Sequence, residues 1–347
     1  MARGRIAAQL LLGLALACGA PAAPGPAASA GGGASPSASA VPPTPVALRF
    51  GLNTTGANVA PLWAAKDEGF FTKYGLDVDL LPISGGEQVV STLVSGEVPL
   101  TTIAATPLVN AGLSGADLVY VAAYSYWLRF FLYARPEYTA VAQLRGKQIA
   151  ITGRAGVVRK SAEIVLTRNG LDPERDATLM ATGNVTNSMA ALLSGAVDGA
   201  MLSPPGMFRA QDGGMRLLAD TTEYHYPSLA GVVVSRAWMA RNEDLVRRAI
   251  QALGEGLAYV HTQPERTKAL IAKHSDLDDP SLLDRTYEIL LPAWERVPYA
   301  PADLIRPELE DAAPEQQAAR DARPEQFVDN HLVGVLDQEG FFAGLAP

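Results

Sequence analysis

Cysteine is nearly absent from this chain of 347 residues: Cys18, close to the amino terminus, is the only one. A single thiol cannot close an internal disulfide and cannot supply a Cys₄ zinc site. Because Cys18 precedes the region that we expect to fold, thiol catalysis in the folded part is excluded as well.

Signals for metals and nucleotides are also missing. The histidines show no metal spacing; they stand at positions 225, 261, 274 and 331. Neither G-x-G-x-x-G nor GxxxxGK(S/T) occurs, and Ser203 lacks the G-x-S-x-G context of a hydrolase nucleophile. We therefore expect no metal, no cofactor and no catalytic residue.

Basic residues are outnumbered, with 28 Lys and Arg against 36 Asp and Glu and a net charge of −8. They form no basic block, which argues against nucleic acid as a partner. The charge of a small-ligand site can differ in sign from that of the whole chain.

The amino terminus has the features of a secretory signal. Arg3 and Arg5 precede an apolar run at 6–17, which is too short to span a bilayer. Cys18 follows where cleavage is expected, so 1–18 resembles a bacterial lipoprotein signal peptide with Cys18 as the lipidation site, although Ala15 stands where leucine is usual. Ordinary secretory cleavage is the alternative. Residues 19–45 are rich in Ala, Gly, Pro and Ser and carry no charge, which predicts a disordered tether.

A strand–helix pattern begins near Val46 and occurs twice. In the first copy we expect strands at 46–52, 76–81 and 98–103, with helices at 58–68 and 87–95. In the second copy we expect a strand at 147–152 and a helix at 157–168. Two segments of the first copy have counterparts in the second copy, in the same order. The first copy reads GLDVDLLPISGG and then LVSGEVPLTTIAATP, and the second reads GLDPERDATLMATGN and then LLSGAVDGAMLSPP. Chance recurrence of common connection residues is the alternative, but the ordered repetition favours two similar α/β lobes with parallel strands.

Ligands of open α/β sheets bind beyond the carboxyl ends of the strands, where helix amino termini offer free N–H groups. Two such lobes facing each other would enclose a central ligand cleft. The loops after the expected strands contain these candidate ligand-binding residues: Thr54, Thr55, Asn58, Gly85, Gly86, Ala105, Thr106, Gly153, Arg154, Ala155, Asn184, Ser203 and Pro204. The polar ones are equally suited to cap the helices that follow.

The sequence resembles the SsuA/THI5-like (NMT1-type) substrate-binding proteins of bacterial ABC importers. The resemblance lies in PLWAAKDEGFFTKYGLDVDL, LVSGEVPL, LRGKQIAITG and LLSGAVDGAMLSPP, and it covers about residues 47–236. It implies a type II periplasmic-binding-protein fold, in which the chain leaves the first lobe, builds the second and returns. We propose crossings at 130–135 and 229–235. The first lobe then comprises 46–135 and 229–347, and the second comprises 136–228.

Two segments after the second crossing are expected to be packing helices of the first lobe. Residues 242–261 place Val246, Ile250, Leu253 and Leu257 on one helical face. The tail at 324–342 has a similar pattern.

An aromatic cluster follows the expected strand at 118–123. Tyr124 and Tyr126 could stack on a flat ligand, and Arg129 or Arg154 could pair with an anionic group. The alternative is that the aromatic side chains belong to the core and the arginines to the surface.

These features favour a non-catalytic, monomeric receptor that closes on a small solute and delivers it to an ABC permease. The resemblance implies sulfonate-, pyrimidine- or aromatic-carboxylate-like solutes and an extracytoplasmic place, membrane-anchored through Cys18 or periplasmic without that anchor. An enzyme on the same fold, such as a menaquinone-pathway dehydratase, is the alternative, although the export signal argues against a cytoplasmic pathway. The thiamin-pyrimidine synthases and desulfinases of similar fold depend on cysteines that the folded part lacks.

Overall fold

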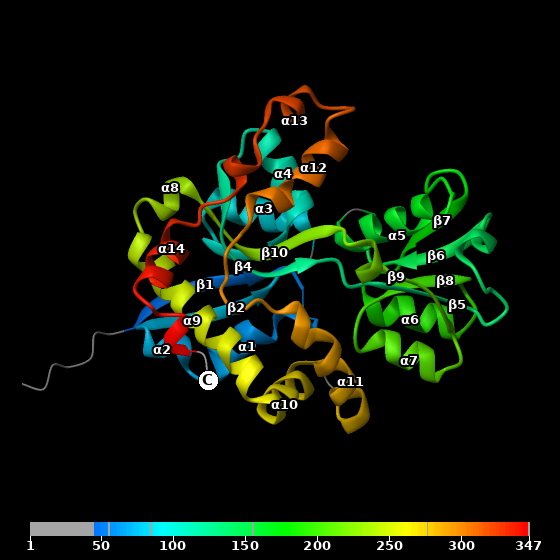
Figure 1. The fold of residues 1–347 in the computed structure, drawn as a ribbon, viewed down its shortest axis with the longest axis horizontal. Helices are drawn as coiled ribbons and strands as arrows, with labels where there is room; N and C mark the ends of the chain where they lie inside the picture. Colours follow the sequence, from blue (N-terminus) through cyan, green and yellow to red (C-terminus); the bar gives the residue numbers. More distant parts are fainter. Residues whose placement is uncertain (1–44, 55, 84, 155, 276, 346–347) are drawn as a thin grey trace, which may run out of the picture. The chain divides into compact units, whose positions relative to one another are not determined.

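The computed structural model describes residues 45–54, 56–83, 85–154, 156–275 and 277–345. The expected signal segment, Cys18 and nearly all of the tether lie outside the described residues, as do the candidate site residues Thr55 and Ala155. In the described part, ten strands form two separate five-stranded sheets (Figure 1). No helix there is long and apolar enough to span a membrane.

The first sheet has the strand order β2-β1-β3-β10-β4. Strands β1, β2 and β3 pair in parallel, whereas β10 runs antiparallel to both of its neighbours. β4 therefore runs in the same direction as β1. The strands are β1 (Val46–Leu52), β2 (Leu76–Pro82), β3 (Leu100–Ala104), β4 (Leu118–Trp127) and β10 (Pro227–Ser235).

The second sheet repeats this plan in the order β7-β6-β8-β5-β9. Strands β6, β7 and β8 are parallel, and β5 in the fourth position runs antiparallel to β8 and β9. The strands are β5 (Phe131–Ala134), β6 (Lys147–Ile151), β7 (Ala177–Ala181), β8 (Gly199–Leu202) and β9 (Arg216–Asp220).

The two sheets share pairing offsets as well as strand order. Residues paired between β1 and β2, and between β6 and β7, are 30 positions apart in the sequence. Residues paired between β1 and β3, and between β6 and β8, are 50 positions apart. The pairs are Val46 with Leu76, Lys147 with Ala177, Phe50 with Leu100, and Ile149 with Gly199. The prediction of an α/β fold with two similar parallel units is confirmed.

Helices connect the parallel strands on both sheets. In the first unit they are α1 (Ala60–Asp67), α2 (Phe70–Lys73), α3 (Gly86–Ser95) and α4 (Ala105–Leu113). In the second they are α5 (Val157–Arg168), α6 (Val185–Leu193) and α7 (Gly206–Asp212). Gly69 ends the first helix with a φ of +77°, as expected, but the short α2 then intervenes before β2.

The rest of the chain after β10 is helical. Its helices are α8 (Arg236–Met239), α9 (Glu243–Thr262), α10 (Pro264–Ser275), α11 (Pro280–Leu290), α12 (Arg306–Ala312), α13 (Gln317–Asp321) and α14 (His331–Gln338). Short 3₁₀ turns at 57–59, 141–144, 221–224, 291–293, 302–305, 324–327 and 343–345 join the longer elements.

Apolar side chains cover both faces of each sheet. On one face of the first sheet, residues of β1 and β2 share a core with α1, α9 and α14; on the other, residues of β3 and β4 pack with α3 and α4. The second sheet has one core with α5 and another with α6, α7 and α11. The expected packing face of 242–261 is confirmed, because Val246, Ile250, Leu253 and Leu257 of α9 are all in the first core.

The structure differs from the sequence expectation at the crossing segments. The strand expected at 118–123 continues to Trp127 as β4, because β10 pairs with it over that whole length. Residues 131–134, which we assigned to the first lobe from the sequence, form β5 and pair only with strands of the second sheet. The links between the sheets are therefore 128–130 and 221–226.

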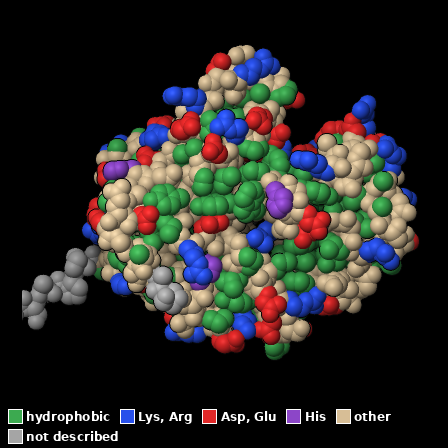
Figure 2. Space-filling view, viewed as in Figure 1, with side chains coloured by type: hydrophobic (Ala, Val, Ile, Leu, Met, Phe, Trp, Pro, Cys, Tyr) green, Lys and Arg blue, Asp and Glu red, His purple; other side chains and the backbone are tan. Residues whose placement is uncertain are grey.

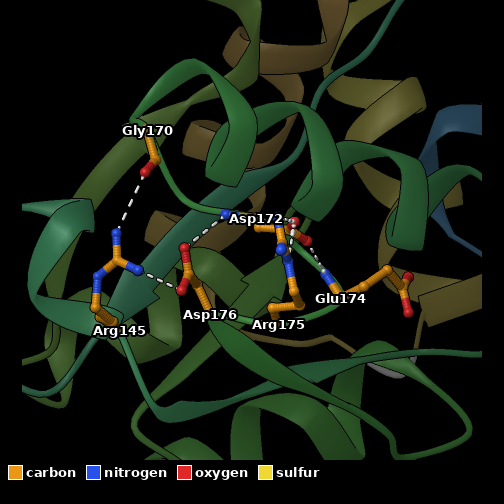
Figure 3. A network of polar contacts seen from close by, with 6 residues as sticks. All are labelled: Arg145, Gly170, Asp172, Glu174, Arg175 and Asp176. Carbon is orange, nitrogen blue, oxygen red and sulfur yellow. Dashed lines mark hydrogen bonds and ion pairs between the residues drawn. The ribbon is translucent and has the colours of Figure 1, made fainter.

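The connection from α5 to β7, at 169–176, is folded into a polar network at the amino ends of the strands (Figure 3). The Arg145 guanidinium pairs with Asp176, whose other oxygen accepts the amide of Asp172 at 2.9 Å. Asp172 in turn accepts Glu174 N at 2.9 Å and Arg175 Nε at 2.6 Å. Residues 172–176 thus form a compact turn directly before β7.

Candidate functional site

Three loops leave the carboxyl edge of each sheet and lead into helices. In the first sheet they follow β1, β2 and β3, and in the second they follow β6, β7 and β8. Because the three strands of each set are parallel, their carboxyl ends lie at one edge. Each helix start there presents backbone N–H groups without intrahelical partners, which suits polar or anionic ligand groups.

The loop after β1 is held by side chains from its neighbours. Asn53 N donates to Thr102 Oγ1 at 3.1 Å, and that hydroxyl donates to Asn53 Oδ1 at 2.9 Å. Thr54 Oγ1 accepts Gly56 N at 3.1 Å, and the carbonyl of Asn58 accepts the Trp294 indole N–H at 2.9 Å. The candidate residues Thr54 and Asn58 are therefore half-buried in a constrained loop.

Two glycines begin α3 at the same edge. Gly85 has a φ of +89°, a conformation that side-chain-bearing residues rarely adopt. A Cβ on Gly86 would lie 2.7 Å from the Cβ of Pro107, so glycine permits the close approach of α3 to α4. Ala105 is buried, and Thr106 is half-buried in the first turn of α4.

The aromatic cluster lies within β4 rather than after it. Tyr124 is 1% exposed and belongs to the core beneath the sheet. Tyr126 is half-buried, and its hydroxyl donates to the carbonyl of Tyr299 at 2.7 Å. Burial raises the pKa of both hydroxyls well above the usual value, so they stay protonated at neutral pH. Tyr124 thus packs as the core alternative describes.

Arg129 lies in the first link between the sheets. Its Nη1 donates to the carbonyl of Ile289 at 3.3 Å, and its buried Nε has no partner among the described residues. Burial lowers the pKa of Arg129, whereas the carboxylates of Asp220 and Glu295 oppose that shift. Among the described residues, Arg129 forms no ion pair within 4.0 Å, so it remains a candidate partner for an anionic group.

Of the second-sheet candidates, Arg154 and Asn184 are exposed. Arg154 lines a pocket of about 460 Å³ beside the edge strand β7, together with Arg159 and residues 179–181. Arg159 donates to Glu163 at 2.6 Å and also pairs with Glu174. Gly153, in the same loop as Arg154, is half-buried.

The remaining two loops of the second sheet begin α6 and α7. Asn184 is exposed and caps α6, because its Oδ1 accepts Asn187 N at 2.8 Å. The carbonyl of Ser203 accepts Met207 N at 3.1 Å, and Pro204 is buried beside it, joined to Pro205 by a cis peptide bond.

A polar cluster that sequence reasoning missed joins elements of the two sheets. The Lys160 ammonium of α5 pairs with Asp311 of α12, and Tyr226 Oη donates to the same Asp311 oxygen at 2.6 Å. Glu308, one turn earlier on α12, is 5% exposed, and its burial raises its pKa while Lys160 and the Thr106 hydroxyl act in the opposite direction. The segment RPELED contains three acidic residues, and nothing in its pattern marks Glu308 as the buried one.

A second set of contacts joins α11 to α7. Arg285 Nη1 lies 3.1 Å from both carboxylate oxygens of Asp212, and its Nη2 donates to Gln211 at 2.8 Å. The guanidinium also lies 4.2 Å from the ring centroid of Phe208. The C-terminal helices are therefore tied to the second sheet at two places.

The described residues contain no group of three or more His, Cys, Asp or Glu side chains placed to hold a metal ion. On the face shown in Figure 2, acidic and basic side chains are interspersed rather than gathered into a block of one sign. The chemistry available at the strand-end loops is therefore that of backbone N–H groups, hydroxyls, amides and individual charges.

Two curated relatives match most of the chain. YtlA of Bacillus subtilis (strain 168), named as a binding protein, is 24% identical over 237 residues, which cover 66% of this chain and 71% of YtlA. RibY of Chloroflexus aurantiacus (strain ATCC 29366 / DSM 635 / J-10-fl), named as a riboflavin-binding protein, is 25% identical over 246 residues, which cover 68% of this chain and 69% of RibY.

Solved structures share the fold at low identity. The alkanesulfonate-binding protein SsuA from Xanthomonas axonopodis pv. citri, bound to MOPS, superposes with a TM-score of 0.67 at 21% identity, covering 82% of this chain and 99% of SsuA. This likeness shows the periplasmic-binding-protein fold. The family described as NMT1/THI5 like matches residues 56–267, more than half of the 347 residues, so this chain belongs to that family.

Proposed function

We propose that this NMT1/THI5-like protein is the extracytoplasmic solute-binding component of an ABC importer. Its relatives are named for binding, and SsuA, which shares its fold, binds alkanesulfonate. The solute is a small organic molecule of the sulfonate, pyrimidine, aromatic-carboxylate or flavin type. The protein captures it as a monomer and presents it to the permease without changing it chemically.

The observation that carries this proposal is the duplicated strand plan. Two sheets with one order and one set of offsets each present three helix starts at a carboxyl edge. We draw the first lobe as 45–127 with 227–345, and the second as 131–220. The solute then lies between the loops of the two lobes, and rotation about the two links closes them over it.

A solute screen tests the proposal. Purified protein is heated with sulfonates, pyrimidines, aromatic carboxylates and riboflavin, and the shift in melting temperature is measured. A true ligand at 100 times its Kd stabilises the folded state by about 2.7 kcal/mol. Small-angle scattering should show a smaller radius of gyration with that ligand, and mass spectrometry should recover it unchanged. Conversion of the solute to a product would instead favour an enzyme.

A matched pair of variants on α6 locates the solute. Asn184→Trp places a bulky group at the helix start, on the carboxyl edge, and should abolish the ligand-induced shift. Ser194→Trp places the same group at the other end of the helix, where Ser194 is also exposed, and should leave the shift intact. The lost cap costs the first variant about 1 kcal/mol, which its melting temperature without ligand will register. Equal ligand shifts in both variants would place the solute elsewhere.

We also propose that the protein is held at the outer membrane face by a lipid on Cys18, which lies outside the described residues. Expression in a bacterial host with labelled palmitate should label the wild type and leave Cys18→Ser unlabelled. A labelled serine variant would remove the assignment.

A further inference from the structure

Glu308 is a buried acid whose surroundings do not account for its burial. It lies on α12, where only Glu308 and Leu309 are buried, and its exposed fraction is 5%. Removing a carboxylate from water is costly unless donors or a cation compensate. Of the described polar groups near it, those that stabilise its ionised form are the Thr106 hydroxyl and the Lys160 ammonium.

The position of Glu308 connects it to the strand-end loops of both sheets. Thr106 is the second residue of α4, which begins directly after β3. Lys160 is in the first turn of α5, which follows β6 in the other sheet. Glu308 influences the pKa values of Tyr226, in the second link between the sheets, and of Tyr120 in β4. The carboxyl group thus lies near the first turns of α4 and α5, where the proposed solute would contact both lobes.

Lys160, the cation near Glu308, already forms an ion pair with another carboxylate. Lys160 pairs with Asp311, which also accepts the Tyr226 hydroxyl at 2.6 Å, and the Tyr226 ring centroid lies 5.6 Å from Lys160 Nζ. Counting Lys160 against Glu308 and Asp311 leaves one negative charge when Glu308 is ionised. A carboxylate can accept about four hydrogen bonds, and the Thr106 hydroxyl is the nearby donor that favours the ionised form of Glu308.

We infer that Glu308 selects the solute by accepting a hydrogen bond from its N–H group, such as an ammonium, amidine, amino-substituted ring or ring N–H. This inference rests on the proposed function and narrows it. Simple organic anions are disfavoured, because their charge would meet Glu308 and Asp311.

Matched probes that differ in one N–H-bearing group test the inference. The pairs are 4-aminopyrimidine with pyrimidine, taurine with ethanesulfonate, and riboflavin with N3-methylriboflavin. Titration calorimetry on the full mature chain should show that one donor-bearing member binds the wild type at least about ten-fold more tightly than its partner. The range for a hydrogen bond to a charged group is about ten- to hundred-fold in Kd.

Two variants of one helix separate recognition from folding. Glu308→Leu removes the acceptor and should abolish the preference for the donor-bearing probe, while binding of its donor-free partner is unchanged or tighter. Glu310→Leu makes the same change at an exposed position of α12 and should keep the preference. Glu308→Gln, which retains an acceptor and the side-chain volume, guards against misfolding and should retain part of the preference for a neutral donor.

The outcomes distinguish this inference from the proposed function. Tight binding of ethanesulfonate or another donor-free anion, with lobe closure and no effect of Glu308→Leu, would overturn the role of Glu308 and leave the solute-binding function standing. A preference that survives in Glu308→Leu would also overturn it. If no probe binds the wild type, both proposals are rejected.

Discussion

Replacing Gly256 by alanine should strongly destabilise the first lobe. Gly256 lies inside α9, and a Cβ there would be 2.0 Å from the carbonyl oxygen of Pro61 and 3.0 Å from its carbon. Both atoms belong to the backbone of α1, so no side chain can rotate away. Contacts below 3.0 Å are not seen for real Cβ atoms, so the two helices must separate by about 1 Å.

The size of the effect follows from two opposing contributions. Alanine in place of a helical glycine favours folding by about 0.5–1 kcal/mol. Overpacking costs about 1–3 kcal/mol, and a gap of about 1 Å between α1 and α9 forfeits up to half of the local dispersion energy. We therefore expect a net loss of about 1–2.5 kcal/mol in the free energy of unfolding.

Gly334 provides the matched control. It lies in helix α14 without a positive φ, and an added Cβ would meet no atom within 4 Å. Gly334→Ala should therefore stabilise the protein by about 0.5–1 kcal/mol. Urea unfolding of both variants, analysed at equal m-value, measures the contrast. Similar midpoints for the two variants would refute the close packing of α1 against α9.

Three further predictions concern charged side chains. Burial raises the pKa of Glu308, so the unfolded state releases that proton first and the free energy of unfolding falls as pH rises above about 4.3. Glu308→Gln should flatten this fall, measured by urea unfolding between about pH 4 and 7. Parallel curves for the wild type and the variant would contradict the prediction. Burial would raise the pKa of Asp198, but Gln148 N, the Tyr138 hydroxyl and Arg135 together hold that pKa below its usual value. Asp198→Asn should lower the free energy of unfolding by about 1.5–3 kcal/mol at pH 7, and by progressively less as the pH falls through the native pKa. A difference that stays constant with pH would exclude ionic pairing. Arg285→Ala removes side-chain contacts between α11 and α7 and should weaken solute binding about five- to thirty-fold if the lobes close as proposed. The control is Arg306→Ala, because Arg306 pairs with Asp303, only three residues away. Equal affinities for the two variants would show that the Arg285 contacts do not contribute to closure.

The repeated part of the fold could be predicted from sequence because its signals are local. Alternation marked β2, glycine after an amphipathic run marked the end of α1, and the bounds of α5 were predicted to the residue. The extension of β4 to Trp127 and the placement of β5 in the second sheet depend on pairing with β10, β8 and β9. Those partners are distant in sequence, and no local pattern reports them.

The candidate site was predictable as a set of loops but not as a set of contacts. Strand ends identified Thr54, Gly85 and Asn184 from their position alone. The burial of Tyr124 and the contact of Arg129 with the Ile289 carbonyl depend on the helices after β10, which approach from another part of the chain.

The duplicated plan explains why the distinctive chemistry comes from outside the repeats. Two copies of one βαβ pattern supply similar helix starts and backbone donors, which any polar solute can use. The unduplicated C-terminal region contacts these frames where they differ: Trp294 donates to the loop after β1, Glu295 N donates to the carbonyl of Tyr124, and Asp311 of α12 binds Lys160. On that reasoning, Glu308 and its neighbours distinguish this protein more than the glycines and threonines of the strand-end loops do.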